Sequence, residues 1–337
     1  MIRRLLWGTL VVVVAAALAL AWSFQPSPLK VPAAAPVTVP ASPAPPPLAI
    51  SVLHAGRMKS AAAMAFRGGA FDDERVFGMD AVLVEHPKGS LLIDSGFGHD
   101  VDAHFRTTPK LMQRTAQYTA ETPVAQQLRD SGRDLADLMA VVLTHAHWDH
   151  VSGLADLPGV PVWLPQAELD FVRSGHPATA LARDLVRRHD WHVVVFDDGP
   201  YLGFERSHDV FDDGTVVLVP AGGHTPGSTI VFLSLPDGRR YGLIGDLVWQ
   251  ADGLTELAER PWLARALVDV DPADVRHRIV ELHQLEAQMP DLLLVPAHDR
   301  ERMRQLPPLR PRDRVQQGRV SGPARVSAGD QPTASAG

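Results

Sequence analysis

The sequence predicts a mixed α/β fold of the α+β kind, with most of the chain in one large domain. Short apolar runs bounded by glycine, proline or polar residues recur along it, for example at 138–143 and 292–295, and are typical of buried strands. Stretches with helical spacing of apolar residues, such as 272–285, alternate with these runs. Side chains able to bind metal follow several of the predicted strands. Each half of the domain therefore combines hairpins with helices and carries polar groups where strands end.

The composition excludes several classes of protein. Of the 337 residues 45% are hydrophobic, which is ample for a sizeable core. The formal net charge is -7 and the lysines and arginines are scattered, so no basic face for nucleic acid is expected. The chain has no cysteine, which excludes disulfides, cysteine metal ligands and lipoprotein-type acylation.

Residues 1–25 predict a membrane-directed segment. Two arginines precede Leu5–Trp22, an uncharged and mostly apolar run close to the ~20 residues that span a bilayer. Small residues at 17–21 fit the cleavage site of a signal peptide, whereas the length of the apolar run favours an uncleaved anchor. We expect the body of the protein in the cell envelope, periplasmic or otherwise extracytoplasmic, and either anchored in the inner membrane or secreted.

The remaining chain divides by composition into three segments. Residues 26–47 are rich in proline and alanine with a single charge, Lys30, and predict an extended, semi-rigid spacer. Residues 48–305 hold the strand and helix patterns and form the predicted domain. Residues 306–337 are rich in proline, arginine, glycine and serine without apolar periodicity, so we expect a disordered tail.

The first half of the domain begins with a strand at 49–54 and a hairpin of strands at 81–86 and 90–93. Residues 55–80 between them are expected to form a long loop, and loops of that length are usually functional or disordered. Thr122-Pro123 is a typical helix start, with threonine as the cap and proline at the first position. We expect helices at 122–131, 166–173 and 178–188, and strands at 138–143, 160–164 and 193–196.

Four potential metal ligands follow the strand at 138–143, within the stretch HAHWDH. His145 and His147 are two residues apart, so in extended backbone they point the same way and can share one metal. Asp149 and His150 are adjacent and face together only if the chain turns there, where they could face a second metal. Neutral imidazoles suit zinc, and a carboxylate compensates charge.

The second half of the domain supplies three more candidate ligands. A hairpin spans about 211–219, and His224 follows in a loop whose flanking glycines let the backbone pass closely around a metal. Asp246 ends the next hairpin, where a carboxylate can bridge two cations. Asp271-Pro272 caps a long helix, and the last strand, 292–295, leads to His298.

The ordered set of motifs resembles the metallo-β-lactamase superfamily. HAHWDH is similar to its H-x-H-x-D-H signature, and further matches follow in chain order from about residue 50 to 303. The resemblance implies a four-layer αβ/βα sandwich and a pair of divalent cations, which we expect to be Zn²⁺. It also implies that Asp94 hydrogen-bonds and orients a ligand rather than binding metal. The matching segments are IDSG at 93–96, GHTPG at 223–227, GD at 245–246 and PAHD at 296–299.

The expected site holds two divalent cations. His145, His147 and His224 would bind the first cation. Asp149, His150 and His298 would bind the second, and Asp246 would lie between the two. The charge of the two cations exceeds that of the two carboxylates, Asp149 and Asp246. This excess lowers the pKa of bound water from ~15.7 towards ~7. We expect a zinc-dependent hydrolase in which the bridging hydroxide attacks a carbonyl carbon, with Asp149 passing a proton to the leaving group.

Within the superfamily the chain is most similar to the N-acyl-homoserine lactonases, through Ala55-Gly56-Arg57, Asp246 and the ending DPADVRHRIVELHQLE…PAHD. That resemblance implies an ester or lactone substrate, with the segment containing Met58 and Phe66 at the substrate mouth. Those lactonases usually carry a tyrosine where this chain has Trp249, whose indole donates a hydrogen bond but is no acid. Trp249 either lines an apolar acyl pocket or serves packing alone.

Other functions remain open at this point. A β-lactam hydrolase would suit export, but an aspartate at the bridging position is atypical of true β-lactamases. A glyoxalase-type thioesterase normally has a C-terminal helical region, which is not evident here, and iron redox relatives usually place glutamate where His147 stands. A nuclease would need a positive surface. A non-catalytic, tethered metal-binding protein is disfavoured because structural zinc sites are closed and tetrahedral.

Overall fold

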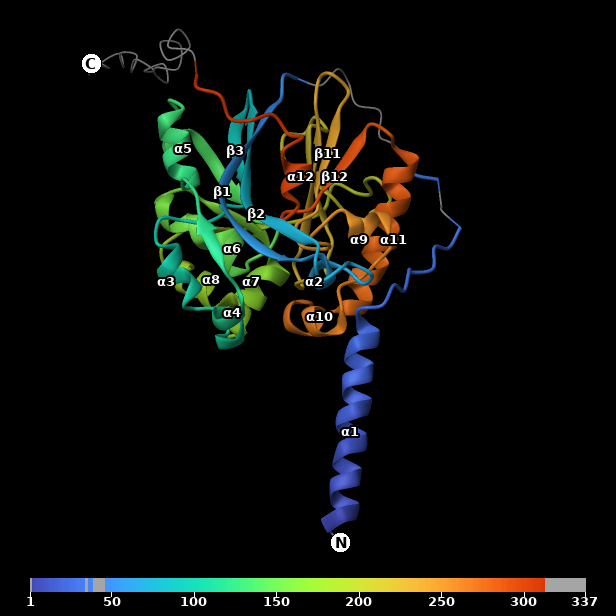
Figure 1. Cartoon of the computed structure of the whole chain (residues 1–337). Helices are drawn as coiled ribbons and strands as arrows, with labels where there is room; N and C mark the ends of the chain where they lie inside the picture. Colours follow the sequence, from blue (N-terminus) through green and yellow to red (C-terminus); the bar gives the residue numbers. More distant parts are fainter. Residues whose placement is uncertain (1, 34–35, 39–45, 313–337) are drawn as a thin grey trace, which may run out of the picture.

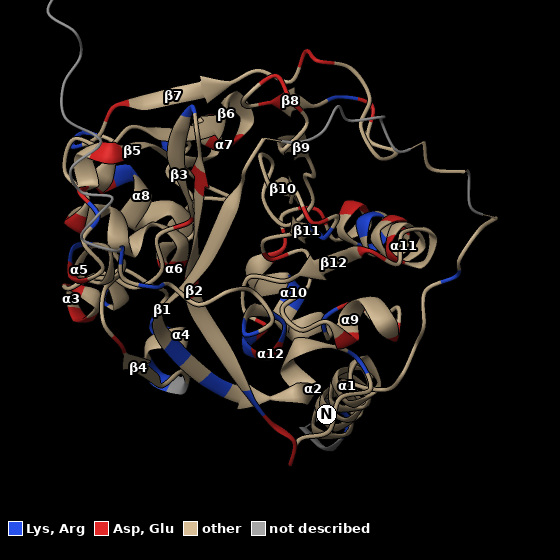
Figure 2. Ribbon diagram, turned by 90° about the horizontal axis from the view of Figure 1, so that it is seen from above, with Lys and Arg blue, Asp and Glu red and all other residues tan. Residues whose placement is uncertain are grey.

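The computed structural model describes residues 2–33, 36–38 and 46–312, in which a pair of β-sheets lies face to face between layers of helices (Figures 1 and 2). One sheet has the order β4-β1-β2-β3-β5-β6-β7 and the other β12-β11-β10-β9-β8. The four-layer αβ/βα arrangement confirms the predicted fold. The strands of the first sheet are β1 (Ala49–Ala61), β2 (Glu74–His86), β3 (Gly89–Ile93), β4 (Tyr118–Ala120), β5 (Leu138–Val142), β6 (Val162–Pro165) and β7 (Trp191–Val194). Those of the second are β8 (His208–Asp209), β9 (Val216–Pro220), β10 (Thr229–Ser234), β11 (Arg240–Leu243) and β12 (Leu292–Val295).

The helices cover the outer faces of both sheets, with α5 and α8 over the first sheet and α11 over the second (Figure 2). Asp271 caps α11 as expected, since its carboxylate accepts hydrogen bonds from the backbone N–H groups of Ala273 and Asp274. The helices are α1 (Ile2–Ser23), α2 (Ala62–Ala65), α3 (Val101–Phe105), α4 (Lys110–Thr115), α5 (Val124–Asp130), α6 (Trp148–Val151), α7 (Gln166–Arg173), α8 (Ala180–Leu185), α9 (Asp252–Thr255), α10 (Trp262–Val268), α11 (Pro272–Gln288) and α12 (Arg300–Met303).

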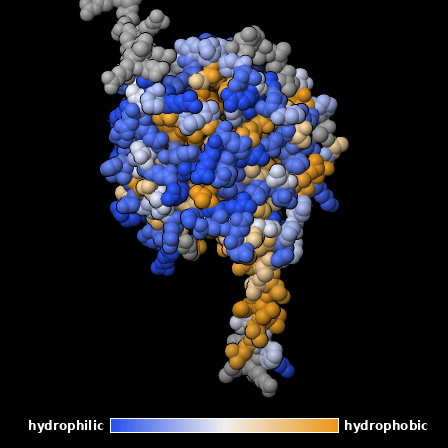
Figure 3. Space-filling model, turned by 45° about the horizontal axis from the view of Figure 1, so that its top comes forward, coloured by the Kyte–Doolittle hydropathy of each residue, from blue (hydrophilic) through white to orange (hydrophobic). Residues whose placement is uncertain are grey.

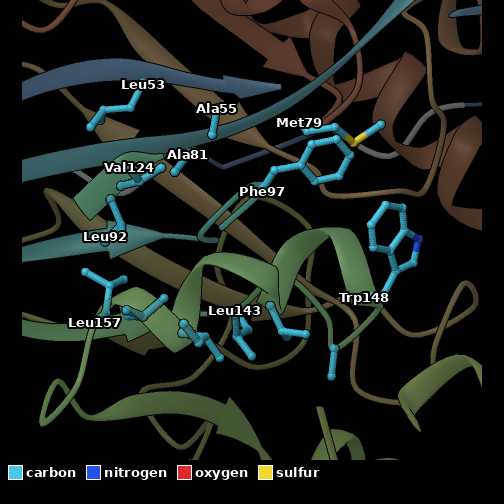
Figure 4. Close-up of a cluster of buried hydrophobic side chains, with 14 of the residues drawn as sticks. Leu53, Ala55, Met79, Ala81, Leu92, Phe97, Val124, Leu143, Trp148 and Leu157 are labelled. Atoms are coloured by element: carbon cyan, nitrogen blue, oxygen red, sulfur yellow. The ribbon is translucent and has the colours of Figure 1, made fainter. Parts of the chain in front are cut away.

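Alternating side chains of the strands build three apolar layers. The middle layer lies between the sheets and includes Val84 and Val142 from one and Val231 from the other. A second layer packs the first sheet against its helices, and Figure 4 shows Leu92, Phe97 and Trp148 among its members. The third joins the second sheet to α11. Because both faces of the central strands are buried, their ends are held rigidly, and the candidate ligands follow these ends.

Residues 55–80 form the outer ends of β1 and β2, joined by α2 and a turn at 66–73, rather than the predicted loop. β1 pairs with β2 from Ala49↔Glu85 to Ala61↔Glu74, with a register shift between His54 and Arg57. The expectation was wrong because the outer ends of these strands mix charged residues with glycine and small residues and lack the clear apolar pattern of the inner ends. A bulge at such a place bends the strand. The hairpin therefore reaches over the site region instead of leaving it to a flexible loop.

The N-terminal helix α1 projects away from the body (Figure 1). Its segment Leu6–Ser23 is long and apolar enough, by length and composition, to cross a membrane. Where the following spacer is described, it is not a free tether. Leu29 N–H donates to Leu257 O at 2.8 Å, and Gln284 Nε2 donates to Pro32 O at 2.8 Å, so the chain is bound along the body. Residues 34–35 and 39–45 of the predicted spacer lie outside the described residues.

The predicted boundary at residue 305 lies too early. Leu306 is buried, and Val52 N–H donates to Pro307 O at 2.9 Å. The Arg312 guanidinium then donates to Glu85 Oε1 at 3.0 Å. These contacts hold 306–312 against the body, because backbone pairing and a partly buried ion pair replace the apolar periodicity on which the prediction relied. Residues 313–337 of the predicted disordered tail lie outside the described residues.

Replacing Glu85 by glutamine is expected to lower the free energy of unfolding by about 1 kcal/mol at pH 7, a small value because solvent partly screens the pair. Burial opposes the charged carboxylate, but Arg133 and Arg312 outweigh it and hold the pKa of Glu85 below its ordinary value of 4.5. A depressed folded-state pKa means that the stabilisation is present above the unfolded pKa and is lost as pH falls through the folded one. Denaturant unfolding at pH 7 and at pH 3 measures the difference.

The matched control is Glu301→Gln, because Glu301 pairs with Arg304 at 2.7 Å but is 80% exposed. We expect no measurable change from that variant. Equal effects of the two substitutions at pH 7, or an effect of Glu85→Gln that persists unchanged at pH 3, would contradict the assigned role.

Candidate metal centre

Three imidazoles converge after the ends of β5 and β9. The backbone stays extended after β5, so His145 and His147 reach the same side as predicted, and the loop after β9 brings His224 to them. His145 Nε2 lies 3.1 Å from His147 Nδ1, and His224 Nε2 lies 3.2 Å and 3.0 Å from these two atoms. Tetrahedral zinc bound to nitrogens would set them roughly 3.3 Å apart. The spacing therefore fits three nitrogens around one cation.

A second group lies beside the first. Helix α6 begins at Trp148, so Asp149 and His150 fall in a first helical turn and can face the same way, as predicted. His298 follows β12, and its Nε2 lies 3.4 Å from Asp149 Oδ2. Potential ligand atoms of Asp149, His150 and His298 all lie within 4.8 Å of one another. Side chains far apart in the sequence thus form a second possible cation site.

Asp246 lies between the two groups. Its carboxylate oxygens are 3.2 Å from His150 Nε2 and 3.1 Å from His298 Nε2. They are also 3.7 Å from His224 Nε2 and 4.0 Å from His145 Nε2. Gly245, at φ +54, precedes it where an added Cβ would lie 3.0 Å from Thr144, so the turn that presents this carboxylate requires glycine. One carboxylate can therefore serve both groups.

Burial and charge set the protonation of these residues. Burial lowers the pKa of His145 and of His147 well below the ordinary value, so both are neutral, as metal ligands must be. Burial acts the same way on His150, but the carboxylates of Asp94 and Asp246 outweigh it and raise the pKa of His150. Burial alone would raise the pKa of Asp246, yet the facing histidines lower it. Asp246 therefore stays anionic.

His150 Nε2 and Asp246 Oδ1 face each other at 3.2 Å in the buried centre. Neither atom has a further hydrogen-bond partner among the described residues, so both can turn to a cation placed beside them. Neutral imidazoles and carboxylates are the donors that suit zinc. The residues present therefore fit divalent cations with nitrogen and oxygen ligands.

Asp94 contacts a candidate ligand, as the sequence predicted. Its Oδ2 lies 2.8 Å from His150 Nδ1 and accepts a hydrogen bond from Thr144 Oγ1, while Oδ1 accepts from Thr144 N–H. Asp94 has φ 55, in the left-handed region that side chains rarely adopt. With Nδ1 held by this carboxylate, His150 presents Nε2 to the centre.

Sequence reasoning missed three buried charged residues that hold the ligands. Asp269 Oδ1 lies 2.9 Å from His224 Nδ1, and Arg260 Nη1 donates to the same carboxylate at 2.9 Å. Arg260 also donates to the backbone O of Asp246. Glu168 accepts from the N–H groups of Ala146 and Gly227 at 2.7 Å and 3.0 Å, which ties the two histidine loops together. None of the three stands in a motif, so only the tertiary contacts reveal them.

Replacing Asp269 by asparagine is expected to weaken metal binding about 10-fold, within the range for carboxylates that orient a ligand histidine. The charge that holds His224 and compensates Arg260 is lost, while the side-chain volume is kept. Competition for zinc with a chromogenic chelator measures the affinity. The control is Asp190→Asn, on a residue whose side chain is 77% exposed. Unchanged zinc affinity in correctly folded Asp269→Asn protein would contradict the role.

The predicted substrate residues lie at different distances from this centre. Trp249 Nε1 donates to Asp246 Oδ2 at 2.9 Å, and its ring meets the edge of Phe77 at 6.0 Å between centroids. The Arg260 guanidinium carbon lies 4.5 Å from the Trp249 ring centre. Met58 is the strand partner of Phe77 and is half-buried. Phe66 is buried at the end of α2 and belongs to the apolar layer of the first sheet. Trp249 therefore contacts the centre directly, Met58 is linked to it through Phe77, and Phe66 belongs to the buried core.

Known proteins share both the sequence pattern and the fold. The metallo-β-lactamase superfamily pattern matches residues 75–298. A probable metallo-hydrolase of Mycobacterium tuberculosis is 34% identical over 235 residues, covering 65% of this chain and 73% of the relative. The N-acyl homoserine lactonase AttM of Rhizobium radiobacter is 23% identical over 235 residues, covering 64% of this chain and 80% of the relative.

Solved structures agree with the fold. An N-acyl homoserine lactone hydrolase with N-hexanoyl-L-homoserine bound at its catalytic metal centre superposes with a TM-score of 0.61. The match covers 77% of this chain and 96% of that one at 16% identity. A quorum-quenching N-acyl homoserine lactone lactonase gives a TM-score of 0.60 at 15% identity, covering 78% and 98% of the two chains. At these identities the likeness concerns the fold alone.

Proposed function

The chain belongs to the metallo-β-lactamase superfamily, and on this premise we propose that it is a binuclear, zinc-dependent hydrolase that opens lactones of the acyl-homoserine type. The observation that carries the proposal is the position of Asp246, whose carboxylate lies within 3.2 Å of His150 and 3.1 Å of His298 and within 3.7 Å of His224. A carboxylate shared by two groups of histidines is suited to bridge two cations.

The proposed ligand sets follow the two groups. Asp149, His150 and His298 hold one cation, Asp246 bridges, and the other cation is held by His145, His147 and His224. When bound, such a pair supplies Lewis acidity and a hydroxide at neutral pH for attack on a carbonyl carbon. Asp94, Asp269 and Glu168 hold the ligands in place through the hydrogen bonds described above.

Asp149 and Trp249 are proposed to act on the substrate. The Asp149 side chain is 12% exposed, more than either of its histidine neighbours in the second group, so it can meet a leaving group. Its carboxylate would take the proton of the hydroxyl that has added to the carbonyl carbon and pass it to the alcohol oxygen released when the ring C–O bond breaks. Trp249 would present the apolar face of its indole to an acyl chain while its N–H stays on Asp246. Met58 and Phe66 would line the outer region of the same mouth.

The lactone substrate is supported by two independent observations. The relatives with matching sequence include N-acyl homoserine lactonases, and the match spans 80% of AttM. The position of Asp246 between the two histidine groups also supports a bridging carboxylate, which is atypical of true β-lactamases and so argues against a β-lactam substrate. No other chemistry of the superfamily is favoured by a specific contact in the described residues.

Turnover of a panel of substrates tests the proposal. The full chain, loaded with zinc, is assayed on acyl-homoserine lactones of short and long acyl chain, on thioesters and on β-lactams. We expect kcat/KM for at least one lactone to exceed that for every thioester and β-lactam by about 100-fold or more. A preference for a thioester or a β-lactam would replace the lactone, and no turnover of any class would favour a tethered metal-binding protein.

We also infer that α1 is retained as a membrane anchor. The Arg67 guanidinium stacks over the Trp22 ring, 4.6 Å from its centre, and donates to the backbone O of Gln25 and of Trp22 at 3.1 Å and 3.2 Å. Gly68 N–H donates to Phe24 O at 2.9 Å. These contacts build the end of the apolar helix into the body, which supports an anchor in preference to a cleaved signal. The hydrolase body would then stand on the extracytoplasmic side.

A further inference from the structure

Helix α10 exposes an apolar face. Trp262, Leu263 and Leu267 are 54%, 36% and 55% exposed, and Ala266 beside them is exposed as well. Their spacing places them on one side of the helix, whereas Ala264 points inward and is buried. Amphipathic helices of soluble domains normally turn their polar face to water and bury their apolar face. A tryptophan and two leucines gathered on one exposed face therefore indicate an interaction surface.

This face lies at the end of the body from which α1 projects (Figure 1). Phe71, 67% exposed, contacts Phe24 directly after α1, with ring centres 5.0 Å apart. Helix α4 lies at the same end and carries Leu111, 53% exposed, between two exposed cationic residues, Lys110 and Arg114. By contrast, Figure 3 shows a predominantly hydrophilic surface on the side of the body turned away from the stalk. We call Phe71, Leu111, Trp262, Leu263, Ala266 and Leu267 the basal surface.

We propose that the basal surface lies on the lipid bilayer that α1 spans, and that the hydrolase takes acyl substrates from that bilayer. The occupant is a membrane because the apolar helix α1 leaves the body at this end and continues directly from it. Tryptophan and leucine beside basic residues are the composition of helices that rest in the headgroup region. Lys110 and Arg114 are placed to attract anionic headgroups.

The segment 259–271 links the basal surface to the metal centre. At its start, Glu259 pairs with Arg67, which holds the anchor. Arg260 then binds the backbone of Asp246, and after α10 the carboxylate of Asp269 holds His224. The N–H of Val270 also donates to His224 O at 3.0 Å. Helix α10 therefore lies in one short segment together with the residue that pairs with Arg67 and the residues that hold Asp246 and His224, so a substrate that leaves the bilayer at this face would start beside the centre.

Site-directed labels test the position of the basal surface. The chain has no cysteine, so Leu263→Cys and Leu267→Cys each give one labelling site. A nitroxide is attached to each variant of the full chain in phosphatidylcholine vesicles with about 30% phosphatidylglycerol. Collision with oxygen, which dissolves in lipid, is compared with collision with a water-soluble nickel chelate. Val195→Cys is the matched control, an apolar residue 60% exposed after β7 at the far edge of the first sheet.

We expect the ratio of oxygen to nickel accessibility to be at least about threefold higher at 263 and 267 than at 195. Equal ratios at the three positions would overturn the proposal. Shielding of 263 and 267 from both reagents would also overturn it, because a second copy of the chain would then cover the surface. Flotation of the labelled protein with the vesicles separates the membrane anchor from the contact of the basal surface with lipid. Protein that does not float would reject the anchor. Protein that floats with its labels exposed to water would reject only the contact of the basal surface.

Delivery from lipid rests on the proposed lactonase activity and has its own test. The double variant Leu263→Glu, Leu267→Glu is compared with the parent chain in vesicles on a dodecanoyl and a butanoyl lactone. We expect KM for the long-chain lactone to rise about 10-fold, with kcat and the butanoyl reaction unchanged. Equal changes for both lactones would reject delivery through lipid. Absence of lactone turnover in the parent chain would instead reject the proposed function. The label measurement would still decide whether the basal surface lies on the bilayer.

Discussion

Replacing Asp246 by alanine is expected to lower kcat/KM on the order of 10³-fold and to reduce the metal content below two ions per chain. Asp246 is only 6% exposed, and its carboxylate faces histidines of both groups. Without it, Asp149 alone would compensate the charge of the two proposed cations. Elemental analysis of zinc-loaded protein and steady-state kinetics measure the two effects.

Two further variants sharpen this result. Asp252→Ala removes the same charge from a residue that pairs with Arg75 at 3.0 Å and is 32% exposed, and it should retain both metals and full activity. His298→Ala should lose the cation of the second group and keep that of His145, His147 and His224. Full turnover by either Asp246→Ala or His298→Ala would contradict the two-metal scheme.

Four of the candidate ligands could be predicted from local geometry, whereas the other three needed the family pattern. His145 and His147 differ by two positions after a buried strand, and Asp149 and His150 share a turn, so spacing alone aligns them. The other three candidates follow different strands: His224, Asp246 and His298. Only their order along the chain, matched to a family pattern, indicated that they come together.

The residues that hold the ligands could not be predicted in the same way. Asp269 lies two positions before the cap of α11 and 45 positions from His224, and no periodicity links the two. Glu168 is the third residue of an ordinary helix, α7, where it would usually face water, yet it is fully buried between two loops. Such roles depend on how the helices dock, which a local pattern does not contain.

The errors in the fold have a similar origin. The β1–β2 hairpin beyond the bulge has few apolar residues of its own, and its strands are held by each other and by Arg300, which donates to Gly56 O. The spacer after α1 is predicted to be extended and semi-rigid, and its composition gives no sign of contacts with the body. It is instead bound by backbone groups such as Leu29 N–H, and hydrogen bonds of that kind leave no mark on composition.

Removal of metal is the remaining large effect that we expect. Prolonged dialysis against a chelator should lower the rate of lactone turnover by at least about 10³-fold. It should also lower the thermal midpoint by roughly 5–10 °C. Activity fails because no side chain in the ligand groups can replace the activated solvent. Stability would fall because imidazole nitrogens 3.0 Å and 3.2 Å apart would lose the cation that they are proposed to share.

Restoring metal separates the catalytic loss from damage to the fold. Two equivalents of zinc per chain should recover both turnover and thermal midpoint, and one equivalent should recover much more stability than activity. The His298→Ala variant serves as a matched control. Its thermal midpoint should rise with one equivalent of zinc, and its activity should return with neither one nor two equivalents. Undiminished turnover in protein shown by elemental analysis to be free of metal would mean that the buried histidines have another purpose, and the hydrolytic scheme would have to be abandoned.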